Sequence, residues 1–131
     1  MSDEFIPKED FLKKYIEPFT PLHYVYWPDK GFIVWRASTG ENAELLHIHT
    51  FVRGKGYSKE LVKEMMRQLA EKPPYYSVFG FALSSREALK EVYPKLGFNI
   101  TPDIEAPYKG GPSFIFWQSF EELKKKYLDG K

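Results

Sequence analysis

The sequence predicts an α+β domain in which a mostly antiparallel sheet is flanked by helices. Short runs rich in β-branched and aromatic residues fill the first half of the chain, and turn residues separate them. In the second half, amphipathic helical patterns alternate with further strand-like runs. No repeat or linker divides the 131 residues, so we expect a single domain over residues 1–131.

The first half is predicted to hold one helix and three strands. Pro7 suits the first position of a helix, and apolar residues follow it at helical spacing. The Pro-Asp-Lys-Gly sequence at 28–31 is a turn that joins two strands as a hairpin. Three consecutive antiparallel strands are therefore expected. The predicted elements are a helix at 7–17 and strands at 23–27, 32–37 and 44–51.

The second half is predicted to alternate helices and strands. Apolar residues stand four apart from Tyr57 onward and give one broad buried helical face. Ser84 and Glu87 have the spacing of a capping box, and Gly97 is placed to end the helix that follows. Ser119 is the predicted cap of the last helix. The predicted elements are helices at 57–70, 84–96 and 119–128, strands at 75–83, 98–100 and 113–118, and a polar loop at 101–112.

Composition narrows the function classes. Hydrophobic residues make up 43% of the chain and aromatic residues 18%, which excludes a disordered protein. The net charge of +1 argues against a nucleic-acid-binding or nucleic-acid-modifying protein. The sequence has no cysteine, so it has no disulfide and no thiolate metal ligand. With no apolar segment long enough to span a membrane and no signal peptide, a cytoplasmic location is expected.

The most specific feature is a glycine-containing segment between the third predicted strand and the helix at 57–70. It reads Arg53-Gly54-Lys55-Gly56-Tyr57-Ser58. Its glycines can adopt backbone angles closed to other residues, which lets several N–H groups point into one concavity. The helix N-terminus adds unpaired N–H donors and the positive end of the helix dipole. The segment therefore predicts a pyrophosphate-binding loop; an ordinary glycine turn before a helix is the alternative.

This loop resembles the coenzyme A loop of the GNAT superfamily of N-acetyltransferases, usually Arg/Gln-x-x-Gly-x-Gly/Ala. Downstream, Tyr93-Pro94-Lys95-Leu96-Gly97-Phe98 is similar to that family's Tyr-x-x-x-Gly-Phe signature. The resemblance implies a GNAT-like acyl-CoA N-acyltransferase fold whose N-terminal region is shortened to one helix. It also implies acetyl-CoA as cosubstrate, without a metal. A shortened N-terminal region implies an open acceptor pocket, a partner chain that completes the pocket, or a larger substrate.

The resemblance further implies where acetyl-CoA lies. The strands that end near residues 48 and 83 should splay apart and hold pantetheine between them. The nearest substitute for an asparagine common in the family is Ser85. The implied coenzyme-binding residues are Ile48, Phe51 and Val52 at the exposed strand edge, then Arg53, Gly54, Lys55, Gly56, Tyr57 and Ser58 around the pyrophosphate, and Ser85 near the thiol or pantetheine.

In catalytic members of the family an amine attacks the thioester directly, with an acid and a base to move protons. Tyr93 stands four residues before Gly97, where the family has its tyrosine acid; without the resemblance it reads as a core aromatic. The base is open between His47, His49, Glu44 and a chain of waters. Alternation places both histidines on one side of their strand unless a bulge intervenes, and an ordinary imidazole pKa of about 6.5 suits a base.

The predicted function is transfer of an acetyl group from acetyl-CoA to a primary amine of a small molecule or a protein. The alternative is a coenzyme-binding module that lost catalysis and serves as an interaction or regulatory protein. A metal site at the His-x-His sequence is a less favoured alternative. Asp103 and Glu105 are candidates to attract a cationic amine, or are simply solvated. A homodimer formed through an edge strand at 113–118 also stays open.

Overall fold

The computed structural model describes residues 5–18, 22–38, 41–71, 76–106 and 111–129, and only the backbone of residues 105, 106 and 129. The first residue of the strand predicted at 75–83 and residues 107–110 of the loop predicted at 101–112 lie outside these ranges. The elements are α1 (Lys8–Phe11), the π-helical turn η1 (Leu12–Ile16), β1 (His23–Trp27), β2 (Gly31–Ser38), β3 (Asn42–Thr50), α2 (Tyr57–Ala70), β4 (Ser77–Leu83), α3 (Leu89–Lys95), β5 (Asn99–Ile100), β6 (Ile104–Ala106), β7 (Gly111–Ser119), α4 (Phe120–Lys124) and the π-helical turn η4 (Lys125–Asp129).

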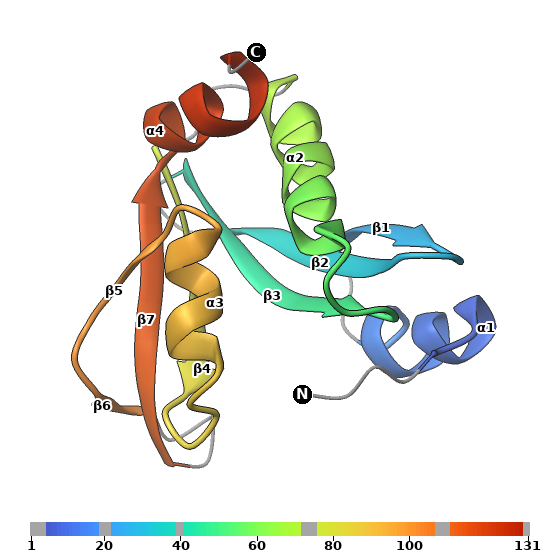
Figure 1. The fold of residues 1–131 in the computed structure, drawn as a ribbon, viewed down its shortest axis with the longest axis horizontal. Helices are drawn as coiled ribbons and strands as arrows, with labels where there is room; N and C mark the ends of the chain where they lie inside the picture. Colours follow the sequence, from blue (N-terminus) through green and yellow to red (C-terminus); the bar gives the residue numbers. More distant parts are fainter. Residues whose placement is uncertain (1–4, 19–21, 39–40, 72–75, 107–110, 130–131) are drawn as a thin grey trace.

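The strands form one mixed sheet of seven, flanked by the helices (Figure 1). The order along the sheet is β1-β2-β3-β4-β7-β5, and β6 also pairs with β7. Every pair is antiparallel except that of β3 with β4. This architecture confirms the predicted α+β fold with a mostly antiparallel sheet, including the three consecutive antiparallel strands of the first half.

The parallel pair β3 and β4 holds together at one end only. The two strands pair through Ala43 with Val78 and through Glu44 with Phe79. Beyond these positions β3 continues to Thr50 and β4 to Leu83, and the described residues show no further pairing between them. The strands therefore diverge, as Figure 1 shows, and confirm the expected splaying. Backbone groups along the inner edges of both strands are left without a neighbouring strand.

A β-bulge lies in β3 just before its two histidines. The register moves from Trp35 opposite Leu45 to Val34 opposite His47, so Leu46 is an extra residue. After the bulge, His47 and His49 stand opposite Val34 and Phe32. Because the bulge precedes both histidines, alternation places the two imidazoles on the same face of the sheet. The prediction that they share a face is therefore confirmed.

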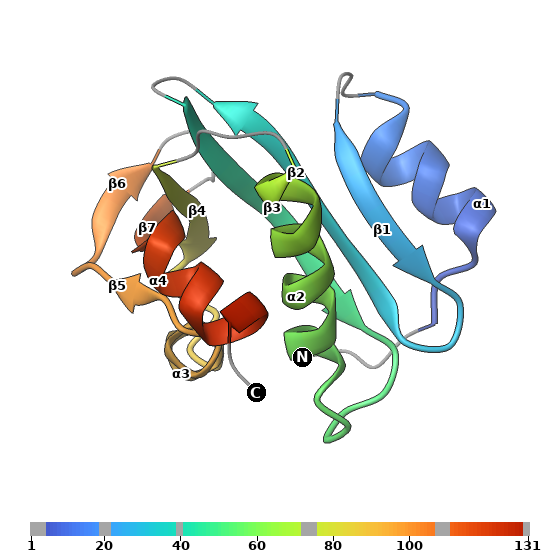
Figure 2. The ribbon, with the colours of Figure 1, turned by 90° about the horizontal axis from the view of Figure 1, so that it is seen from above.

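The two faces of the sheet carry different helices. Figure 2 shows α1 on the outer face of β1 and β2, with α2 on the opposite face. On the α1 side, Phe11 packs on Phe32 with ring centroids 4.4 Å apart. None of the described helices is long and apolar enough to cross a membrane. The residues that α2 buries are Leu61, Val62, Met65, Met66 and Leu69, in the same cluster as Leu89 and Tyr93 of α3 and Phe114 and Phe116 of β7.

Two residues predicted to end or cap a helix are confirmed. Gly97 has φ of +106°, and the Phe98 and Gly97 N–H groups donate to the carbonyls of Tyr93 and Pro94 at 3.0 Å. This glycine-terminated pattern closes the last turn of α3, as predicted. The Ser119 hydroxyl accepts a hydrogen bond from the Glu122 N–H at 3.1 Å, which confirms Ser119 as the cap of α4.

The predicted capping box between Ser84 and Glu87 is wrong. The helix α3 begins at Leu89 with Ala88 as its cap, and no side chain caps it. The Ser84 hydroxyl instead donates to Asp103 Oδ1 at 2.7 Å. Ser84 is therefore used to hold the 101–106 segment against the end of β4, and the chain passes through turns before α3 starts.

Two further predictions about the C-terminal half are wrong. The loop predicted at 101–112 contains the short strand β6, which pairs with the start of β7. The flanking prolines and glycines hid this strand, because they are rare within strands. The segment at 113–118 is not an edge strand, because β7 lies between β4 on one side and β5 and β6 on the other. Two chains cannot pair through it.

Gly80 in β4 is expected to tolerate no side chain. A Cβ atom at Gly80 would lie 2.2 Å from the Phe116 ring and 2.6 Å from the carbonyl oxygen of Leu45. The ring can move but the backbone oxygen cannot, so we expect Gly80→Ala to lower the free energy of unfolding by about 1–3 kcal/mol. Urea denaturation of both proteins measures this loss. A Gly80→Ala protein as stable as the wild type would contradict the close packing of these strands.

Candidate functional site

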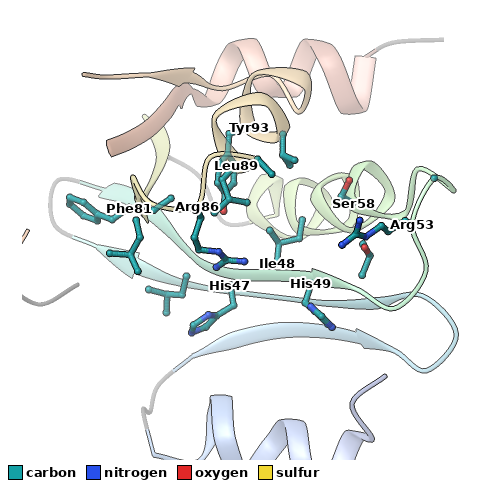
Figure 3. Close-up of a pocket in the computed structure, with 16 residues that line it drawn as sticks. His47, Ile48, His49, Arg53, Ser58, Phe81, Arg86, Leu89 and Tyr93 are labelled. Atoms are coloured by element: carbon teal, nitrogen blue, oxygen red, sulfur yellow. The ribbon is translucent and has the colours of Figure 1, made fainter. Parts of the chain in front are cut away.

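The space between the diverging strands is a cavity of about 420 Å³. This volume lies within the range of pockets that hold small ligands. Its walls come from β3, the loop that follows β3, the end of β4 and the helix α3 with the loop before it. The predicted site residues that line it are His47, Ile48, His49, Arg53, Gly54, Ser58 and Tyr93 (Figure 3).

One end of the cavity has the backbone geometry of an anion cradle. Gly54 and Gly56 have φ angles of +75° and +74°, in the left-handed region that favours glycine. Gly56 is the N-cap of the fourteen-residue helix α2, and no side chain caps that end. The first N–H groups of a helix have no intrahelical partner, and the helix dipole favours an anion there. Figure 3 shows Arg53 and Ser58 together at this end.

Tyr93 enters the cavity from α3 and is held by stacking. Its side chain is only 7% exposed, and its ring lies parallel to that of Phe116 with centroids 3.8 Å apart. Burial raises the pKa of Tyr93 to about 12, although the positive charge of Arg86 acts in the opposite direction. Tyr93 therefore stays protonated near neutral pH. Because this pKa exceeds that of an ordinary thiol, about 8.5, Tyr93 suits hydrogen-bond donation to a thiolate better than complete proton transfer.

The two histidines point to the other face of the sheet. The His47 ring lies 4.9 Å from that of Tyr15, and the His49 ring lies 5.3 Å from that of Phe32. Both partners belong to the side covered by α1 and η1, whereas Ile48 packs with the cluster on the α2 side. Figure 3 shows the imidazoles directed away from Tyr93 across β3. The gap therefore has a hydroxyl donor on one side and imidazoles on the other.

Glu44, the third candidate base, does not line the cavity. It lies at the end where β3 and β4 still pair, and its side chain is buried. Its Oε1 accepts from Arg36 at 2.9 Å to Nη2 and at 3.0 Å to Nε. The Glu44 carboxylate is thus occupied by two hydrogen bonds from one guanidinium. The structure places Glu44 in a structural ion pair, away from the histidines.

Several predicted coenzyme contacts also lie away from the cavity wall. Phe51 is buried among aromatic rings on the α1 side, and Val52 is 42% exposed. Ser85 lines a separate hollow with Ser84 and Asp103. The loop residues Lys55, Gly56 and Tyr57 belong to the cradle segment but do not line the cavity.

The cavity also includes residues that sequence reasoning missed. Phe81 and Leu83 line it from the end of β4, Arg86 from the turn before α3, and Leu89 from the start of α3. The resemblance placed the ends of β3 and β4 on either side of the gap, but the sequence does not show which side chains of β4 and of the turn before α3 face it. For Arg86 the sequence offered one signal: it directly follows Ser85, which the resemblance placed near the thiol or pantetheine.

The proposed acceptor carboxylate Asp103 is engaged elsewhere. It accepts a hydrogen bond from Ser84 and lies 3.4 Å from Lys90 Nζ, and these contacts lower its pKa. It does not line the cavity. Among the described residues, no group of three or more His, Asp or Glu side chains is arranged to hold a metal ion.

No family model matches the sequence, and no curated protein sequence matches it. The three-dimensional fold does match solved structures. One is an acetyltransferase assigned to the GNAT family from Desulfovibrio desulfuricans, with 16% identity and a TM-score of 0.65 over 88% of this chain and 84% of that one. Another is an aminoglycoside 6'-N-acetyltransferase complexed with coenzyme A, with 18% identity and a TM-score of 0.64 over 87% and 83%.

A third match is a longer protein. It is a Bacillus anthracis protein assigned as a streptothricin acetyltransferase, in complex with acetyl coenzyme A, with 21% identity and a TM-score of 0.60. The match covers 69% of this chain and 55% of that one, so this chain spans about half the length of that protein. At these identities the likeness establishes the fold. The chain has the GNAT acyltransferase fold.

Proposed function

We propose that this GNAT-fold chain is an acetyl-CoA-dependent N-acetyltransferase that acts on a primary amine of a small molecule or a protein. One observation carries the proposal: a single cavity joins a phosphate cradle, an unpaired strand edge and a protonated tyrosine. Acetyl-CoA offers a pyrophosphate, a pantetheine amide chain and a thioester in that order. Solved proteins of the same fold hold acetyl-CoA or coenzyme A, which supports this coenzyme.

The residues around the gap suit direct attack. The amine nitrogen attacks the carbonyl carbon of the thioester, a C–N bond forms, and the C–S bond breaks. His47 or His49 takes the proton from the amine, directly or through water, and Tyr93 donates a hydrogen bond to the departing thiolate. A cysteine-linked acyl intermediate cannot form, because the chain has no cysteine. The acid and the base then act from opposite sides of the gap.

A second candidate is a coenzyme-binding module without turnover that serves as an interaction or regulatory protein. It is favoured by the position of Ser85, which was expected to replace a family asparagine near the thiol but lies in another hollow. Both candidates share the coenzyme site and differ only in chemistry. They are therefore separated by turnover and not by binding.

The test is amine-dependent release of the coenzyme thiol. Acetyl-CoA and a panel of primary amines are mixed with the protein, and a thiol reagent reports free coenzyme A without any background from protein thiols. We expect thiol release and an acetylated amine detected by mass spectrometry. Acetyl-CoA binding by calorimetry without turnover on any amine would favour the second candidate. Absence of both binding and turnover would contradict both candidates.

A further inference from the structure

The cavity carries positive charge from two arginines. Arg53 and Arg86 line it, together with the two histidines of β3, and no Asp or Glu of the described residues does so. The two arginines occupy different places. Figure 3 shows Arg53 with Ser58 at the cradle, whereas Arg86 stands nearer to Tyr93 and reaches toward β3 between His47 and Ile48. Arg86 is thus on the side of the reacting thioester and not on the side of the pyrophosphate.

The backbone holds Arg86 at the lip of the cavity. Its N–H donates to the Leu83 carbonyl at 3.1 Å, and its own carbonyl accepts from the Leu89 N–H at 3.0 Å. These turns join the end of β4 to the start of α3, which are both cavity walls. The side chain is exposed and still lines the cavity. Its charge also reaches Tyr93, since it lowers the pKa of that hydroxyl against the effect of burial.

No carboxylate of the described residues neutralises Arg86. Two carboxylates on the surrounding elements have other partners: Glu44 pairs with Arg36, and Asp103 with Ser84 and Lys90. Glu87, the next residue in the chain, lies 3.8 Å from Lys90 Nζ. The guanidinium therefore faces the open cavity with its charge and its hydrogen-bond donors available to a ligand.

We propose that the acceptor is a primary amine that also carries an anionic group, a carboxylate or a phosphate, and that Arg86 binds this group. The inference rests on the proposed acetyl transfer. A guanidinium binds both kinds of oxyanion through two parallel hydrogen bonds, and it repels acceptors that carry only positive charge. Its charge also lowers the pKa of a nearby amine, so that more of the amine is in the neutral form that attacks the thioester.

The experiment uses acceptors in matched pairs. β-Alanine is compared with β-alaninamide, and O-phosphoethanolamine with ethanolamine, so that each pair keeps the amine and differs in the anion. We expect the anionic member of one pair to have a kcat/KM about 10- to 100-fold higher, the range for hydrogen bonds to charged groups. The pair that shows the preference distinguishes a carboxylate acceptor from a phosphate acceptor. Longer spacers between amine and anion extend both series.

Arg86→Gln should bring the preference ratio close to one. Arg67→Gln is the matched control, because Arg67 lies on the exposed side of α2 in an ion pair with Glu64, away from the cavity. The control should leave the ratio at its wild-type value. Acetyl-CoA affinity, measured by calorimetry on each variant, should be the same in Arg86→Gln as in the wild type. A comparable loss of acetyl-CoA affinity would assign Arg86 to the coenzyme and overturn the inference.

The remaining outcomes separate this inference from the proposed function. Turnover of neutral or cationic amines with no preference for the anionic members would overturn the role of Arg86 while acetyl transfer stands. If no amine turns over, the dissociation constants of N-acetyl-β-alanine and of its amide are measured on the coenzyme A-bound protein. Their ratio then reports the preference for the anionic compound. Tighter binding of the anionic compound to wild type than to Arg86→Gln would then support the anion site although the proposed function fails. Equal binding of these two compounds would exclude a carboxylate site, and equal binding of N-acetyl-O-phosphoethanolamine and N-acetylethanolamine as well would overturn the anion site.

Discussion

Gly56→Asp should weaken acetyl-CoA binding by about 100-fold or more, whereas Gly56→Asn should retain most of it. A carboxylate at this position stands at the N-terminus of α2, where the pyrophosphate is expected to bind. A 100-fold loss corresponds to about 2.7 kcal/mol, which like charges a few ångströms apart readily supply in a partly dehydrated site. Calorimetric titration of acetyl-CoA into the three proteins measures the difference.

The asparagine variant isolates the charge. Asp and Asn have nearly the same shape, and both tolerate a left-handed backbone such as the φ of +74° at Gly56 better than most residues do. A Cβ atom at Gly56 would meet nothing within 4 Å, so neither side chain clashes. The fold should therefore be preserved in both variants. Equal affinities for the Asp and Asn variants would place the pyrophosphate somewhere else.

Tyr93→Phe should lower kcat by about 100-fold, the loss expected when one hydrogen-bond donor to a developing negative charge is removed. The substitution removes only the hydroxyl, because a phenylalanine ring can keep the parallel stacking on Phe116 at 3.8 Å. The dissociation constant of acetyl-CoA should therefore stay within about twofold of the wild-type value, because the hydroxyl is expected to act in the transition state and not in binding of acetyl-CoA. Steady-state kinetics and calorimetry measure the two quantities. A variant with the wild-type kcat would leave Tyr93 as a core aromatic.

The pH dependence adds an independent check on Tyr93. Because its pKa is raised to about 12, Tyr93 is protonated at all pH values from about 6 to 10 and produces no alkaline loss of rate there. The pH profiles of wild type and Tyr93→Phe should then have the same shape and differ only in height. An alkaline limb present in the wild type and absent in the variant would show that the hydroxyl titrates within this range.

Local chemistry explains most of what was predicted correctly. The glycines of the cradle and Gly97 adopt left-handed angles because their positions between strand and helix, or after a helix, require them. Ser119 caps α4 because the Glu122 N–H is three residues away in the chain. Each of these features depends on neighbours within a few residues, so a sequence shows it directly.

The errors concern contacts between distant residues. The spacing of Ser84 and Glu87 allowed a capping box, but Asp103 lies close enough in space to take the Ser84 hydroxyl. Glu44 was a candidate base until the β2–β3 register placed Arg36 opposite it. The segment at 113–118 looked like an edge strand because β6 was hidden in a segment rich in proline and glycine.

The sequence by itself determined the fold class, the cradle loop and the residue types available for chemistry, because these follow from local propensity and short-range spacing. Which of the candidate residues lie together around the gap depends on the tertiary structure. The loss of pairing after Glu44 opens the gap, the bulge at Leu46 turns both histidines to the α1 face of the sheet, and the end of β4 brings Arg86 and Tyr93 beside β3. These relations depend on strand register and packing between segments tens of residues apart, which no local pattern specifies.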